Sequence, residues 1–143
     1  PIADGAVDVV LAECSLSVMV DLDRALTEFR RVLRNGGAMV VSDVYARNPA
    51  LVPALRRLPV TCCLRGAASR QEIADRLAAH GFRTLLWEDH SEVLKQLAVG
   101  IIMAHGSMAQ FWCQTTGGCA DATRIQETIT ESKPGYFLFV GRC

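Results

Sequence analysis

The 143-residue sequence lacks a long apolar run, a cluster of basic residues and an excess of charge of either sign. Its longest uninterrupted apolar stretch, residues 97–104, includes a glycine and is far too short to cross a bilayer. Lysine and arginine together number 15, and so do aspartate and glutamate. A chain without net charge offers no bulk attraction to nucleic acid or to an anionic membrane, so both are excluded as electrostatically held partners.

The first residues also lack a secretion signal. Residues 1–5 (PIADG) have neither a basic start nor an apolar core, which predicts a cytoplasmic location. The chain starts at Pro1 rather than at methionine, so we expect the encoded protein to extend upstream. Several enzyme classes leave no trace, because the sequence has no Gly-x-Ser-x-Gly elbow, no phosphate-binding loop and no His-Glu-x-x-His motif.

Cysteine, by contrast, is abundant for a chain with no export signal. We expect reduced thiols, ligands for a soft metal or metalloid, or packing residues in preference to a disulfide framework. A terminal cysteine is expected to fray with the end of the chain. The six cysteines are Cys14, Cys62, Cys63, Cys113, Cys119 and Cys143.

The first third of the chain has the pattern of a βαβ unit. Residues 7–12 (VDVVLA) are almost continuously apolar, as in a parallel strand that is buried on both faces. Residues 21–34 place apolar side chains at helical spacing, and Asn35 to Gly37 supplies a stop. Residues 38–42 (AMVVS) predict a second buried strand. Such a unit builds a parallel sheet that helices cover.

The rest of the chain adds helices and two further strands. Three prolines make residues 45–66 irregular, with at most a short helix at 50–58. Ser69 to Glu72 has the form of a capping box that opens a helix through His80. The expected order then continues with a strand at 82–87, a helix at 91–112 that Gly100 or Gly106 could kink, a loop at 113–120, a helix at 121–131 and a last strand at 136–141.

One domain is expected over residues 1–143, because a chain of this length supports a single core. Its expected parts are a βαβ core at 1–44, an irregular loop at 45–68, and an αβ unit with a helical insertion and a final strand at 69–143.

The run from Asp4 to Val44 resembles the middle of a class I S-adenosylmethionine-dependent methyltransferase. That family has an Asp-Gly loop, its fourth strand, a helix ending in Arg-Val-Leu, a Gly-Gly turn and its fifth strand in this order, as here. The terminal YFLFVG (136–141) resembles the family's antiparallel last strand. The resemblance implies an α/β fold: a partial Rossmann-like sheet of family strands four to seven, the last one antiparallel, with helices on both faces.

Within the family, the sequence is most similar to the arsenite methyltransferases. There, one cysteine follows the fourth strand and a second lies in a Cys-x-x-Gly-Ala segment; Cys14 and Cys63 match these two places. The resemblance implies that Cys14 and Cys63 bind a small soft acceptor such as a trivalent metalloid, since thiolates favour soft centres. Glu13 departs from the small polar residue or asparagine that the family usually has before the first cysteine.

The cofactor that the resemblance implies is S-adenosylmethionine, held in the family by a glycine-rich turn and by an acidic residue for the ribose. Neither signature is found in this sequence, and in the family's layout both would precede Pro1. We expect Ala12 and Glu13 to contact the cofactor in the full-length parent. The present chain alone is expected to be inactive and to bind the cofactor weakly or not at all.

Plainer interpretations stay open at each position. Cys14 and Cys63 could be small packing residues, and Glu13 could line a solvated cleft. The neighbouring Cys62 leaves open which thiol points inward. At the level of function, the alternative is a non-catalytic binding or oligomerisation module that has lost the cofactor-binding half.

Other polar residues have structural interpretations. His80 is best placed as a cation at a helix C-terminus. Asp43, at the end of the second strand, is expected to brace the following loop. Cys113 and Cys119 could be loop thiols or metal ligands.

The strand at Val7 to Ala12 also predicts self-association. In the family this strand lies between the first and the fifth, but here no first strand precedes it, so it becomes a sheet edge. The edge is apolar on both faces and has no lysine or proline to protect it. We therefore expect a homodimer or larger homo-oligomer that meets at or near these residues.

Overall fold

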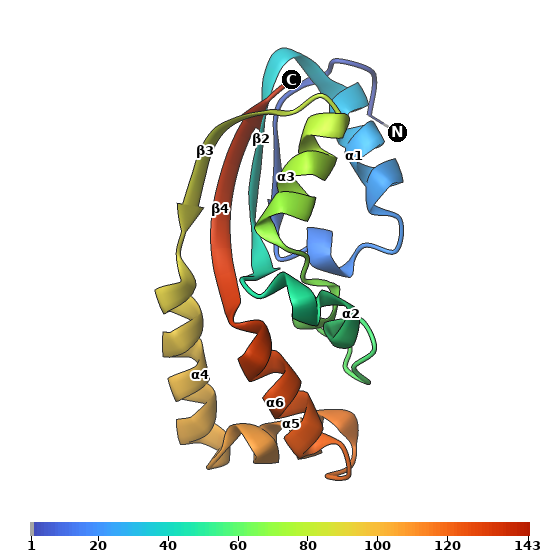
Figure 1. Ribbon diagram of the computed structural model, residues 1–143. Coiled ribbons are helices and arrows are strands. Elements are labelled where there is room, and N and C mark those ends of the chain that lie inside the picture. Colours follow the sequence, from blue (N-terminus) through green and yellow to red (C-terminus); the bar gives the residue numbers. More distant parts are fainter. Residues whose placement is uncertain (1) are drawn as a thin grey trace.

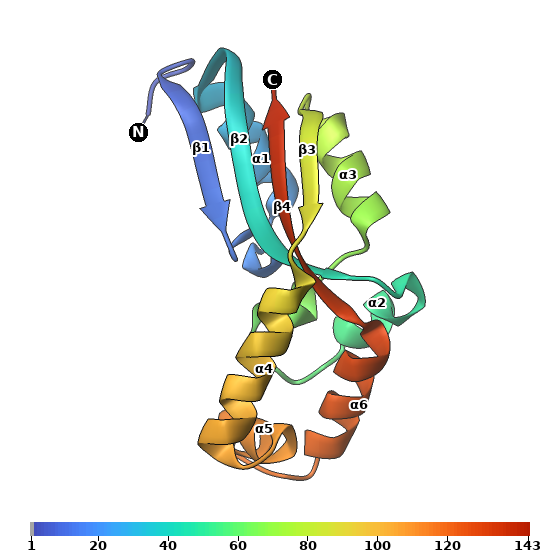
Figure 2. The ribbon, with the colours of Figure 1, turned by 90° about the vertical axis from the view of Figure 1, so that its left-hand side faces the viewer.

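A mixed four-stranded sheet carries helices along one face and continues into a helical lobe (Figures 1 and 2). The computed structural model describes residues 2–143. The strand order is β1-β2-β4-β3. The strands are β1 (Val7–Glu13), β2 (Leu33–Ala46), β3 (Arg83–Asp89) and β4 (Pro134–Arg142).

The pairing agrees with the fold class that the resemblance implied. β1 runs parallel to β2, with Ala12 opposite Val41. β4 is antiparallel to both of its neighbours, β2 and β3. A mixed α/β sheet whose last strand is antiparallel is therefore confirmed.

Two helices lie along one face of this sheet, α1 (Leu22–Val32) and α3 (Arg70–Ala79) (Figure 1). The side chain of Asp21 caps α1 by accepting a hydrogen bond from the backbone N–H of Arg24 at 2.9 Å. The predicted capping box opens α3: the Ser69 hydroxyl accepts from the N–H of Glu72, whose carboxylate accepts from the N–H of Ser69. Local sequence thus sets where both helices begin.

The opposite face of the sheet differs from the expectation of helices on both faces. Among residues 2–143, no helix runs along it (Figure 1). Val9 is 53% and Leu11 61% exposed there, and Val40 and Val140 are half-buried. The strands are apolar enough for two covered faces, but only one face is covered by the described helices.

The second strand is longer than the sequence predicted. The helix α1 ends at Val32, and β2 already begins at Leu33, which pairs with Val7. The predicted helix stop at 35–37 therefore lies within β2, where the register against β1 shifts and Gly36 has a φ of +75°. Because Leu33 pairs with Val7 of β1, these residues belong to the strand, and the helix ends before the local stop signal.

The helical lobe lies beyond the carboxyl ends of β1 and β2 (Figure 2). The predicted irregular segment contains only the one-turn helices η2 (Pro49–Leu51) and α2 (Val52–Leu55) and then η3 (Cys63–Gly66). Gly106, with a φ of +83°, ends the predicted long helix rather than kinking it. The remaining helices are α4 (Ser91–His105), α5 (Met108–Thr116) and α6 (Ala122–Ser132).

Three expectations about cysteine are wrong. Cys113 lies inside α5 rather than in a loop, and it forms a disulfide with Cys119 across a Cα–Cα distance of 4.3 Å. The left-handed Gly117 turns the chain back after α5, which brings the two residues together. Cys143 does not fray, because its N–H donates to the carbonyl of Gly37 at 3.2 Å.

Two apolar cores hold the chain together. The first lies between the sheet and the helices α1 and α3, and it includes Leu26, Met39, Val41, Leu77 and Phe139. The second lies in the helical lobe and includes Val52, Leu55, Trp112, Ile125 and Ile129. None of the helices within residues 2–143 has both the length and the apolar character that a membrane crossing requires.

Candidate functional site

Cys14 follows the carboxyl end of β1, where parallel α/β sheets bind their ligands. Its side chain is exposed, and its φ of +45° is unusual for a residue other than glycine. The backbone N–H of Cys14 donates to the carbonyl of Ser42 at 2.7 Å, which holds this conformation in place. A left-handed turn at an exposed thiol is the kind of local strain that concentrates at functional sites.

Tyr136, from the start of β4, contacts this thiol. The Sγ atom of Cys14 lies 3.3 Å from the phenol oxygen, which is also 3.1 Å from the Ser42 hydroxyl. Burial, followed by the contact with Cys14, raises the pKa of the Tyr136 phenol, so the phenol keeps its proton at neutral pH. Sequence reasoning missed Tyr136, because it lies 122 positions from Cys14 and no local motif links the two.

Cys63, the second cysteine of the predicted pair, lies in η3 and is half-buried. Burial raises the pKa of its thiol to about 11, and the charges of Cys62, Asp43 and Cys14 act in the same direction. Cys14 and Cys63 therefore lie within electrostatic reach of each other. At neutral pH the Cys63 thiol is protonated.

Gly66 explains how η3 comes to lie near Cys14. A Cβ atom at Gly66 would stand 1.7 Å from the carbonyl oxygen of Ser17, in η1 (Leu16–Val18). The backbones of η1 and η3 are thus in direct contact, and only glycine permits it. The Cys-x-x-Gly-Ala spacing noticed in the sequence has this packing as its physical reason.

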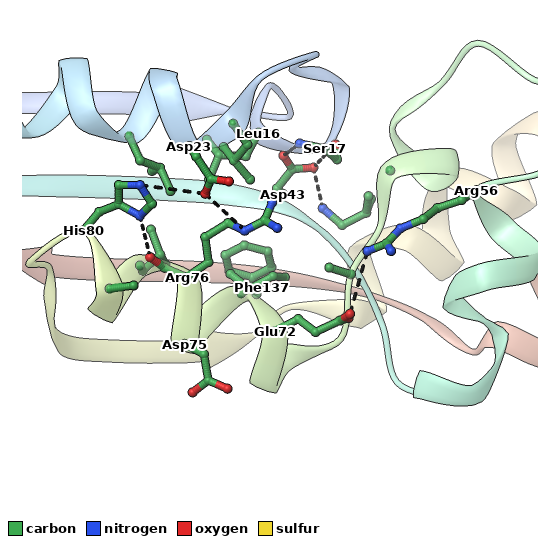
Figure 3. Close-up of a pocket in the computed structure, with 18 residues that line it drawn as sticks. Leu16, Ser17, Asp23, Asp43, Arg56, Glu72, Asp75, Arg76, His80 and Phe137 are labelled. Atoms are coloured by element: carbon green, nitrogen blue, oxygen red, sulfur yellow. Dashed lines mark hydrogen bonds and ion pairs between the residues drawn. The ribbon is translucent and has the colours of Figure 1, made fainter.

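Asp43 braces the same region. Its side chain is 2% exposed, and its carboxylate accepts hydrogen bonds from the backbone N–H and the hydroxyl of Ser17 at 2.9 and 2.7 Å (Figure 3). A third bond comes from the N–H of Val44 at 2.7 Å. A buried carboxylate with this many donors is well satisfied. Asp43 is therefore a structural brace, which fixes η1 to β2.

The two residues predicted to contact the cofactor are placed differently. The side chain of Ala12 is 4% exposed and packs in the first core, so only its backbone could reach a ligand. Glu13 is exposed and pairs with Ser42 in the sheet. The described residues include no glycine-rich turn after a strand.

A pocket of about 480 Å³ lies between α1 and α3, and its lining also includes Ser17, Asp43 and Gly66 (Figure 3). Its floor includes Leu26 and Phe137, and neither Cys14 nor Cys63 is among its lining residues. At one end His80 caps α3, with its Nδ1 2.8 Å from the carbonyl of Arg76 and its Nε2 3.7 Å from Asp23. His80 thus occupies the helix C-terminus, where a cation was expected.

No group of three or more His, Cys, Asp or Glu residues within residues 2–143 is arranged to hold a metal ion. The disulfide occupies Cys113 and Cys119, which leaves neither thiol free for ligation. The cysteines that remain as free thiols are Cys14, Cys62, Cys63 and Cys143.

Comparison with known sequences finds similarity to methyltransferases. A family model described as a methyltransferase domain matches residues 1–41. An arsenite methyltransferase from Aquipseudomonas alcaligenes is 36% identical over 83 residues, which make up 57% of this chain and 24% of that protein. The aligned part thus spans about a quarter of the relative's length.

Solved structures agree on the fold. The cyclase SpnF is 26% identical, with a TM-score of 0.69, and the match covers 99% of this chain and 51% of that one. An arsenic(III) S-adenosylmethionine methyltransferase from Chlamydomonas reinhardtii is 22% identical, with a TM-score of 0.54 and coverage of 99% and 38%. These matches confirm the resemblance to S-adenosylmethionine-dependent methyltransferases, and in particular to the arsenite methyltransferases.

Proposed function

We propose that this chain, which resembles the C-terminal half of a class I S-adenosylmethionine-dependent methyltransferase, holds a small soft methyl acceptor on Cys14 and Cys63. The acceptor that we propose is trivalent arsenic. The observation that carries the proposal is the packing of η3 on η1, because it brings a half-buried thiol into electrostatic reach of an exposed one. Both thiols stand where the arsenite methyltransferases have a cysteine.

The chemistry suits a protonated Cys63. Arsenite at neutral pH is an uncharged trihydroxide. When a thiol binds, an arsenic–oxygen bond breaks, an arsenic–sulfur bond forms, and the thiol proton leaves with the hydroxide as water. The high pKa of Cys63 therefore does not prevent binding, since the proton departs with the leaving group.

Methyl transfer then depends on positioning. The cofactor supplies an electrophilic methyl group on a sulfonium, and the lone pair of a thiol-bound trivalent arsenic is already a nucleophile. No general base is needed, so the chain has to hold the acceptor in line with the methyl group. Glu13, exposed beside Cys14, is proposed to bind the cofactor's ammonium. Weak binding of the cofactor by this chain alone stays a prediction, which titration calorimetry tests.

The comparisons lend no support to the alternative of a non-catalytic module. They do show that the fold alone leaves the reaction open, because one match is a cyclase. The assignment of methyl transfer to a soft acceptor therefore depends on the two thiols rather than on the sheet.

Arsenite titration of the reduced chain tests the proposal. We expect the variants C14S and C63S to lose at least about tenfold in affinity, since each removes one soft ligand. The matched control is C62S, which alters the adjacent thiol of the same segment and should bind as the wild type does. Equal binding by wild type, C14S and C63S would contradict the proposal. In the full-length protein, methylation of arsenite should follow the same order.

A further inference from the structure

We propose that Tyr136 is a positioning residue, whose phenol holds the Cys14 sulfur by a hydrogen bond while that sulfur carries the soft acceptor. This inference rests on the proposed function and extends it to a residue outside the cysteine motifs. It starts from the contact of 3.3 Å between the Cys14 sulfur and the Tyr136 oxygen.

The backbone of Tyr136 is fixed from several sides. Its N–H donates to the Ser91 hydroxyl at 3.2 Å, and its carbonyl accepts from the N–H of His90 at 2.7 Å. In the sheet it pairs with Val44 of β2. The ring therefore approaches Cys14 from a rigid base, whereas the Cys14 side chain itself is exposed.

The protons available on Tyr136 and Cys14 determine which atom donates in their hydrogen bond. With the Tyr136 hydroxyl proton donated to the Ser42 oxygen at 3.1 Å, the phenol oxygen can accept from the Cys14 thiol, since either atom of that contact can be the donor. Once arsenic replaces the thiol proton, the sulfur can only accept. The phenol hydroxyl is then free to rotate from Ser42 to the sulfur, so the contact reverses its direction rather than breaking.

Such a bond would fix a ligand that is otherwise poorly held. Cys14 has a left-handed backbone and an exposed side chain, which leaves its rotamer without packing to select it. Hydrogen bonds from outer groups orient metal ligands, and their loss typically lowers metal affinity by about 10- to 100-fold. The half-buried phenol has one hydroxyl proton that it can donate to the sulfur at this distance.

The first test is arsenite affinity. We expect Y136F to bind arsenite about tenfold more weakly than the wild type, the lower end of the range for such outer groups. The matched control is Y45F, which also removes a hydrogen-bonded phenol, since Tyr45 donates to Asp89 at 2.5 Å. Y45F should bind as the wild type does, because the phenol that it removes contacts Asp89 and neither Cys14 nor Ser42.

The second test measures the contact between Tyr136 and Cys14 through the titration of the phenol. In the Y45F background Tyr136 is the only tyrosine of the chain, so its phenolate absorbance reports it alone. We expect C14S, in that background, to change the titration midpoint of the phenol, and arsenite to raise the midpoint only when Cys14 is present. A tyrosine that did not interact with the Cys14 sulfur would show neither effect.

The outcomes separate the two proposals. Equal arsenite affinity for Y136F and the wild type overturns the role of Tyr136 and leaves the proposed function intact. A phenol titration that neither C14S nor arsenite changes does the same. Wild-type chain that binds no arsenite overturns the proposed function, and the role of Tyr136 with it.

Discussion

Gly66 and Cys63 show how single residues shape the proposed site. Both belong to the segment that packs on η1, and each has a property that can be measured by itself. Gly66 permits contact between two backbones, and Cys63 is a thiol that the fold keeps protonated. Two predictions follow from these properties, one steric and one electrostatic.

The steric prediction concerns G66A. A methyl group there would stand 1.7 Å from the Ser17 carbonyl oxygen, so η3 must move away from η1. We expect a loss of about 1–3 kcal/mol in the free energy of unfolding, as for other overpacked sites, and weaker arsenite binding. Urea denaturation and arsenite titration measure the two effects.

The matched control for G66A is G100A, because a Cβ at Gly100 meets nothing within 4 Å. Alanine in the middle of α4 should stabilise the chain by roughly 0.5–1 kcal/mol. If G66A were as stable as the wild type and bound arsenite equally well, the contact between η1 and η3 would not be what sets the site.

The electrostatic prediction concerns the pH dependence of stability. The folded chain raises the Cys63 pKa from 9.0 to about 11, so folding favours the protonated thiol. The contribution of this thiol to stability is complete below pH 9 and is lost as the pH rises from 9.0 to about 11. Because the group is only partly buried, we expect a loss on the order of 1 kcal/mol.

Urea denaturation across this pH range measures the effect of Cys63, and C63A is the reference. The free energy of unfolding of C63A should fall less steeply than that of the wild type over the alkaline range. Parallel curves for the two proteins would show that Cys63 does not titrate with the raised pKa.

Among the elements, α5 and α6 form a hairpin that the Cys113–Cys119 disulfide closes. The cross-link closes a small loop and so lowers the conformational entropy of the unfolded chain. This stabilises the folded state by about 2 kcal/mol. The double variant C113S/C119S should therefore lose about that much stability, mainly in the helical lobe. Trp112 lies beside the bond and in the second core, so the loss should reach α6.

Hydrogen exchange resolves which elements respond to loss of the disulfide. We expect faster exchange in α5 and α6 and unchanged exchange in β2 and β4, because the sheet has its own core. Reductant should reproduce the effect in the wild type and add nothing in the double variant. Unchanged exchange in α5 after reduction would contradict the prediction.

For the whole molecule, the open side of the sheet predicts self-association. Within the described chain, β1 has a paired strand on one side only, and Val9 and Leu11 are more than half exposed. An unprotected apolar edge tends to find a partner. The homodimer at or near Val7 to Ala12 therefore remains our prediction.

Light scattering at tens of micromolar tests the association. The wild type should be dimeric or larger, and L11K should shift the population to monomer, because a charge at the edge opposes pairing. V20K is the matched control, since Val20 is fully exposed and lies outside the sheet. A monomeric wild type, or equal masses for L11K and the wild type, would contradict the prediction.

Much of the element order was predictable, because the signals that set it are local. The apolar run of β1, the helical spacing of α1 and the capping box at Ser69 each act over a few residues. Where a distant strand intervened, the prediction failed in detail. Leu33 joined β2 instead of ending a helix, because Val7 pairs with it.

The sequence by itself determined the helices and strands, and it marked Cys14 and Cys63 through their resemblance to a family. Only the tertiary structure decided that Tyr136 meets Cys14, that Cys113 bonds to Cys119, and that the described helices leave one sheet face open. The physical reason is the separation along the chain over which each interaction acts. Propensity, capping and periodicity act between near neighbours, whereas the register of β4 on β2 places Tyr136 opposite Val44 and beside a thiol 122 positions away.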